Sequence, residues 1–145
     1  MFRLSLIIVT LWVGALWATG LSAYILFDNL QDKQLAGQLA GKLFTVVSYI
    51  GLVSGIYLLV DRFIGFGLGA FKQGFFWIIF LMLVLVSAGH FGIQPLLAQL
   101  KTNAYPVDVM QSVFASRFKT WHGVASIAYL LECLLGIGLI LKIRN

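Results

Sequence analysis

The sequence predicts an all-α integral membrane protein, an antiparallel bundle of four transmembrane helices with short amphipathic interfacial helices. Its 145 residues are 61% hydrophobic and only 10% charged, whereas a soluble domain carries about 25% charged residues. The mean hydropathy is +0.98. Backbone polar groups in lipid must be satisfied within each spanning segment, so each apolar segment must be helical. We therefore expect a single four-span domain over residues 1–145.

Four apolar segments are each long enough to cross a hydrocarbon core of about 30 Å. They are Leu4–Phe27, Leu43–Val60, Phe75–Leu97 and Trp121–Leu141. The first follows Arg3 and is uncharged throughout, which makes it longer than the apolar region of a signal peptide. We expect it to be a retained span. Leu35, Leu39 and Leu43 recur every four residues, which predicts an amphipathic helix leading into the second span.

The third span ends in the stretch Ser87–Pro95, which contains two polar side chains and a proline. His90 and Gln94 are four residues apart and therefore share a helix face. Pro95 cannot donate a backbone hydrogen bond and clashes with the preceding turn, so the helix should end or kink here, near Gln94. Polar residues beside a kink in a membrane segment are candidates for a functional site.

The connection after the third span contains a turn signal, Asn103–Pro106. Pro106 suits the first position of a helix, and apolar residues recur at helical spacing from Val107 to Trp121. This pattern predicts a helix that begins at Pro106, lies partly along the membrane surface, and continues into the fourth span.

His122 begins the fourth span and shares a helix face with Ser126. Both histidines adjoin the same connection, so His90 and His122 belong to one leaflet, with Arg117 near the same boundary. Three interpretations remain open. The pair ligates a b-type haem or a metal ion, it binds a ligand or relays protons, or each histidine hydrogen-bonds a backbone carbonyl or water.

Glu132 is the acidic residue within the predicted spans. It lies about 15 Å along the helix from His122, near the bilayer midplane. An unpaired carboxylate at that depth is costly. Two interpretations are equally supported: a neutral acid hydrogen-bonded to Ser48, Ser54 or Tyr57, or a proton-relay group in a water-filled cavity.

Small residues recur every four positions on two helices and predict close helix packing, either within the bundle or in a homo-oligomer. These residues are Gly14, Ala18, Ser22, Gly51 and Gly55.

The net charge of +5 arises from basic residues that flank the apolar segments, which indicates contact with anionic lipid head groups rather than nucleic acid. No nucleophile with a base, paired catalytic carboxylates or nucleotide-binding loop is visible, so an enzyme is not supported. Basic residues divide equally between the two sides; we expect a bacterial inner-membrane protein with both termini in the cytoplasm.

Three stretches resemble a family: Trp17–Phe27, Gly41–Phe44 and Arg117–Ser126, the last with its uncommon aromatic-His-Gly-x-x-Ser run. They resemble a four-helix membrane family of unsettled activity that includes transmembrane protein 205 and bacterial domains of unknown function. The resemblance implies the four-span fold and little chemistry. Its eukaryotic member is associated with resistance to platinum drugs, a substrate that does not carry over to this chain.

Three functions follow from these observations. The first is a binding or transport-associated subunit with a polar, histidine-containing site near one interface, working as a homo-oligomer or with a membrane protein partner. The second is a redox protein that holds haem or a metal ion with His90 and His122. The third is a structural membrane component.

Overall fold

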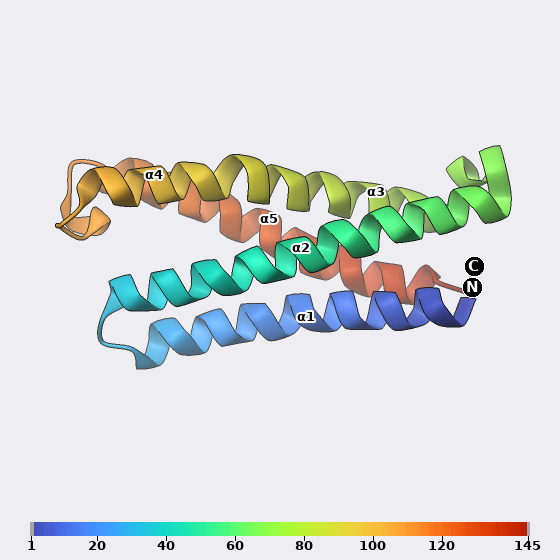
Figure 1. Ribbon diagram of the computed structural model, residues 1–145, viewed down its shortest axis with the longest axis horizontal. Helices are drawn as coiled ribbons and strands as arrows, with labels where there is room; N and C mark the ends of the chain where they lie inside the picture. The colour runs from blue at the N-terminus through green and yellow to red at the C-terminus, as the bar shows by residue number, and fades with distance from the viewer. Residues whose placement is uncertain (1, 145) are drawn as a thin grey trace.

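The computed structural model describes residues 2–144, and these residues form an all-α bundle without strands. Four helical arms run antiparallel, and both chain termini lie at the end where the second arm meets the third (Figure 1). The elements are α1 (Phe2–Asn29), α2 (Lys33–Phe66), η1 (Gly67–Lys72), α3 (Gly74–Ser87), η2 (Ala88–Ile93), α4 (Gln94–Ala104), η3 (Val109–Gln111) and α5 (Ala115–Lys142). Four helical segments are long and apolar enough to cross a membrane, which confirms the predicted fold class.

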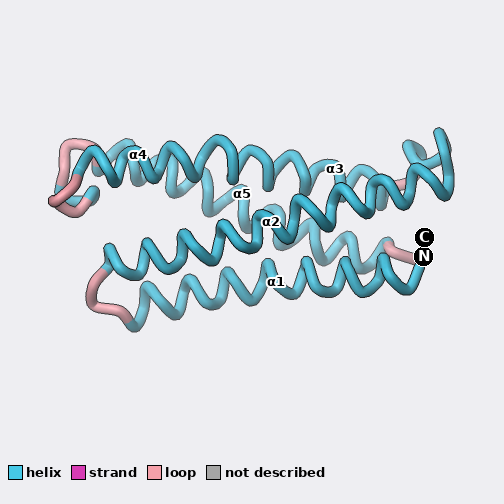
Figure 2. Tube along the Cα trace, in the orientation of Figure 1, coloured by secondary structure: helices cyan, strands magenta, loops and turns pink. Residues whose placement is uncertain are grey.

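The second helix begins well before its apolar segment. Asp32 caps it, because the Asp32 carboxylate accepts hydrogen bonds from the backbone N–H groups of Gln34 and Leu35 at 3.0 and 3.1 Å. The amphipathic lead-in is therefore part of one continuous helix from Lys33 to Phe66. Loops and turns collect at the two ends of the molecule (Figure 2).

Pro95 does not end the third arm, so of the two outcomes predicted near Gln94, an end or a kink, the helix end is wrong. The chain adopts a π-helical turn over Ala88–Ile93, and the backbone N–H of Gln94 bonds to the carbonyl of Gly89. The wider turn makes room for the ring of Pro95, which has no backbone N–H to donate. The helix then continues through α4 to Ala104.

The helix predicted to begin at Pro106 is also absent. A cis Tyr105–Pro106 bond and a short 3₁₀ turn occupy this region, and α5 begins at Ala115. The Asp108 carboxylate accepts from the backbone N–H of Met110 at 3.1 Å, and the Ser112 hydroxyl accepts from that of Phe114 at 3.2 Å. Such local side-chain bonds compete with a continuous helix.

The bundle has two cores. The larger one joins α1, α2, α3 and α5 through buried residues that include Trp12, Leu58, Ile79 and Leu139. A small one lies between α4, η3 and α5, where Leu100, Ala104 and Val109 pack against Phe114 and Phe118. Helix α1 packs on α2, and α4 packs on α5. A cavity lies between these two pairs of helices.

The outward faces are apolar, as lipid contact requires. Val53 on α2 and Ile127 on α5 are 70% and 65% exposed. Exposing apolar side chains to lipid costs little free energy, since the acyl chains around them are equally apolar.

Candidate functional site

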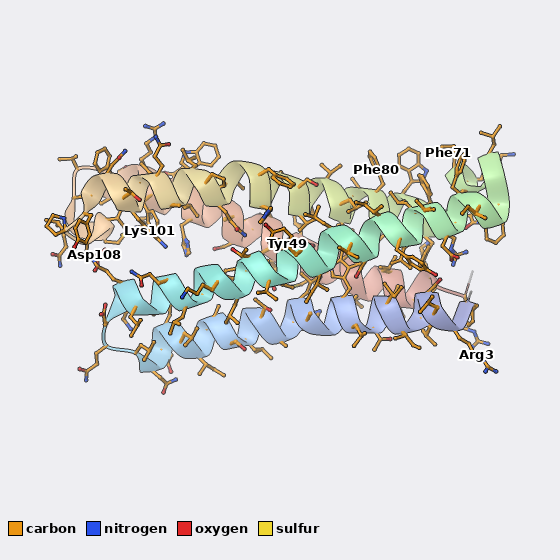
Figure 3. All side chains as sticks on the ribbon, in the orientation of Figure 1. Arg3, Tyr49, Phe71, Phe80, Lys101 and Asp108 are labelled. Atoms are coloured by element: carbon orange, nitrogen blue, oxygen red, sulfur yellow. The ribbon has the colours of Figure 1, made fainter. Side chains whose placement is uncertain are left out.

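A cavity of about 1840 Å³ lies between the helices, in the half of the bundle away from the chain termini. Residues of α1, α2, η2, α4 and α5 line it, mostly with apolar side chains. Its volume exceeds the roughly 300–1,000 Å³ of ordinary small-molecule pockets. Lys101 and Asp108 line the cavity at the end of the molecule that lies opposite Arg3 (Figure 3).

Gln94 joins two walls of this cavity. Its side-chain Nε2 donates to the Ser48 hydroxyl at 3.4 Å, and its Oε1 accepts from the Thr45 hydroxyl at 3.4 Å. The Ser48 hydroxyl donates its own hydrogen to the Phe44 carbonyl at 2.7 Å. The single hydrogen of the Thr45 hydroxyl is shared between Gln94 Oε1 and the Gly41 carbonyl, which lies at 2.9 Å. The start of α4 is therefore connected to the middle of α2 by side-chain hydrogen bonds.

His90 lies in the π-helical turn and lines the same cavity. Its ring makes edge contacts with Tyr49 and Phe91, each with 4.8 Å between ring centroids. The Nδ1 atom is buried and has no hydrogen-bond partner among the described residues. Single π turns are frequent at functional sites, and a buried nitrogen without a partner calls for a ligand or water.

His122 lies on α5 and also lines the cavity. Its ring stacks on that of Phe118, with 5.8 Å between centroids and an interplanar angle of 11°. Within residues 2–144 no hydrogen bond or ring contact joins His122 to His90. The cavity is thus shared by two histidines that do not touch each other.

The other residues predicted beside His122 have separate roles. The Ser126 hydroxyl donates to the backbone carbonyl of His122 at 2.8 Å, so it serves its own helix while lining the cavity. Arg117 is exposed and is not among the lining residues.

Glu132 lies at the deep end of the cavity with a side chain that is 5% exposed. Its Oε1 atom is buried without a hydrogen-bond partner in the described part of the chain. The interpretation that it bonds to Ser48, Ser54 or Tyr57 fails, since no such bond forms and Ser48 donates to Phe44 instead. The carboxyl group is left facing the cavity.

The spacing of the sequence places Tyr129 on the helix face of His122, Ser126 and Cys133, but Tyr129 was not among the predicted site residues. Its hydroxyl donates to the backbone carbonyl of Leu16, and its ring makes an edge contact with Phe44 at 5.0 Å. Tyr129 therefore connects α5 to both α1 and α2 along the cavity wall. The signal available in the sequence was its position one turn before Cys133, on the face shared with His122.

The small residues divide into two groups. Gly51 and Gly55 face neighbouring helices: a Cβ at Gly51 would lie 2.9 Å from Trp12 Nε1, and one at Gly55 would lie 2.6 Å from Leu83 Cγ. Gly14 has open space around it.

Ala18 is exposed like Gly14, while Ser22 is partly buried. Gly136 on α5, which the sequence reasoning missed, packs on Val13 of α1, whose methyl carbons would lie 3.1 Å from an added Cβ. Close approach of helices thus occurs at glycines on α2 and α5.

The fold and the cavity define a class: a small four-span membrane protein with a mostly apolar cavity between its helices. Residues 7–106 match the family model described as a domain of unknown function, DUF4149, and the chain belongs to this family. The match includes His90 and Gln94 and ends before α5. It provides no link to transmembrane protein 205. No curated protein and no solved structure matches the chain.

Proposed function

We propose that this protein binds an amphiphilic molecule in the cavity between its helices and acts as a binding or transport-associated subunit. The observation that carries the proposal is a large, mostly apolar cavity into which a few polar groups converge. Binding sites for small molecules have this composition, with apolar walls and few polar groups that fix orientation.

Two buried polar atoms support this proposal. His90 Nδ1 and Glu132 Oε1 have no partner among the described residues, and both residues line the cavity. Leaving a buried polar group unsatisfied costs about 1–3 kcal/mol. A bound ligand, or water that accompanies it, would recover this free energy by hydrogen-bonding to both groups.

A partner or a second copy belongs to the same proposal, because four short helices rarely enclose a transport path alone. Exposed small residues at Gly14 and Ala18 on α1 offer a face on which another helix can approach closely. We place the protein in a bacterial inner membrane with both termini in the cytoplasm, and we retain the resemblance to transmembrane protein 205 as a hypothesis.

Mass spectrometry of the protein extracted in native membrane discs tests the proposal. Ala125 lines the cavity, so Ala125→Trp should fill part of it and displace a co-purified amphiphile. Ile127→Trp is the control, since Ile127 lies on the outer face of the same helix and is 65% exposed. We expect a stoichiometric ligand in the wild type and in Ile127→Trp but not in Ala125→Trp. Equal retention in both variants would contradict a cavity ligand.

The haem or metal hypothesis has one observation in its favour, which is that His90 and His122 line the same cavity. Among the described residues, no group of three or more histidine, cysteine, aspartate or glutamate side chains is placed to hold a metal ion. Two histidines would therefore have to serve as axial ligands of a haem. A visible absorption spectrum of the purified protein, with and without reductant, decides between this function and amphiphile binding.

A further inference from the structure

We propose that the mouth of the cavity binds the phosphate head group of an anionic phospholipid, with Lys101 as the main contact. The mouth is the end of the cavity lined by Lys33, Lys101, Tyr105 and Asp108. The acyl chains would lie along the apolar walls between the α1–α2 and α4–α5 pairs. The inference rests on the proposed function and names the class of its ligand.

Lys101 reaches across the mouth from one helix pair to the other. Its ammonium lies 3.4 Å from the position of a Cβ on Gly37 of α2, so the missing side chain of Gly37 leaves room for it. The same ammonium lies 5.6 Å from the centroid of the Phe118 ring on α5. A single cation thus lies against both sides of the cavity mouth.

The Lys101 ammonium is available for an anion. No ion pair joins it to a carboxylate in the part of the chain that the structure describes. Asp108 lines the same mouth and attracts the Lys101 ammonium from beyond ion-pair distance, while its Oδ1 accepts from the backbone N–H of Met110. Lys33 differs, because its ammonium donates to the backbone carbonyls of Phe27 and Leu30, the latter at 2.9 Å, and so caps the end of α1.

Charge and size both favour an anionic phospholipid over a neutral amphiphile. Lys42 also lines the cavity, which gives three lysines against Asp108 toward this end. Basic pockets between transmembrane helices bind anionic lipid head groups. A volume of about 1840 Å³ is larger than a single-chain ligand needs and accommodates acyl chains beside the polar groups.

Native mass spectrometry of the full chain, incubated with phosphatidylglycerol or phosphatidylcholine carrying identical acyl chains, tests this proposal. We expect the wild type to retain phosphatidylglycerol preferentially. Lys101→Gln should lower that preference about fivefold, the effect of one lysine near an anionic head group. Lys101→Arg should preserve it, because the positive charge remains.

Lys119→Gln is the matched control, since Lys119 is exposed on α5 and does not line the cavity. It should leave the preference unchanged. Equal retention of the two lipids by the wild type, or an unchanged preference in Lys101→Gln with an intact thermal transition, would overturn the inference. Cavity binding itself would survive that result if Ala125→Trp still displaced the neutral lipid. Retention of neither lipid would overturn the head-group site, and the co-purified ligand would then decide the proposed function.

Discussion

The side-chain amide of Gln94 donates to the hydroxyl of Ser48 over 3.4 Å and thereby links the first turn of α4 to the middle of α2. This contact lies directly after the π-helical turn that carries His90. The turn accommodates Pro95 and delivers Gln94 to the facing helix. One irregularity of the backbone thus positions two of the polar side chains in the cavity wall.

Replacing Gln94 tests this link. Gln94→Leu should lower the free energy of unfolding in detergent by about 0.5–1.5 kcal/mol, the net contribution of such hydrogen bonds. The loss is modest because Ser48 and Thr45 keep their backbone acceptors. Gln99→Leu on the same helix is the control, since Gln99 is exposed. Thermal unfolding of the two variants should therefore differ, and identical curves would show that the link contributes nothing.

Gly55→Leu should destabilise the bundle by about 1–3 kcal/mol through overpacking. A Cβ at this position would lie 2.6 Å from both Cγ and Cδ2 of Leu83, so the Leu83 side chain must shift or α2 and α3 must separate. Gly65→Leu on the same helix is the matched control, because nothing lies within 4 Å of its Cβ position. The melting temperature should fall for Gly55→Leu and stay close to the wild-type value for Gly65→Leu. Equal shifts would argue against close packing of α2 on α3.

Tyr129→Phe should weaken the attachment of α5 to α1 by about 0.5–1.5 kcal/mol, because the Leu16 carbonyl loses its side-chain donor. Tyr49→Phe keeps the ring that contacts His90 and removes a hydroxyl on an exposed residue, so it should be nearly neutral. Hydrogen exchange of the α1 backbone near Leu16 is a sensitive measurement. Exchange that is unchanged in Tyr129→Phe would refute this role.

His90→Ala and His122→Ala, alone and combined, measure whether the two histidines are coupled in stability and whether they are coupled in ligand retention. Their rings contact different residues, so their effects on unfolding should add to within about 0.3–0.5 kcal/mol. Ligand retention should behave differently if both face one ligand: each single variant should reduce it, and the double variant should be little worse than either. Additive losses of retention would mean that the two histidines serve separate ligands or none.

Hydropathy and periodicity were sufficient for the number of arms and for the helical lead-in to the second span. Four apolar segments and the spacing of Leu35, Leu39 and Leu43 are local properties of the sequence. The start of α2 at the Asp32 cap was not predicted. Neither the helix end near Pro95 nor the helix start at Pro106 is present. The rule that proline ends or begins a helix takes no account of the π turn before Pro95. It takes no account either of the side-chain caps that follow Pro106.

The candidate site was predictable only in part. His90, Gln94, His122 and Glu132 all line the cavity, and their polar character in apolar segments was the signal. Their partners depend on packing between distant helices. The same spacing marked Gly14 and Gly55, yet only Gly55 faces another helix, because periodicity identifies a face and does not say what covers it.

The most direct test of the account is a cryo-electron microscopy map of the natively extracted protein, enlarged by a bound antibody fragment. We expect the cavity between α2 and α4 to remain open, with continuous non-protein density from the Lys101 ammonium toward Glu132. A closed bundle, in which α4 packs along α2 and leaves no cavity, would contradict the account.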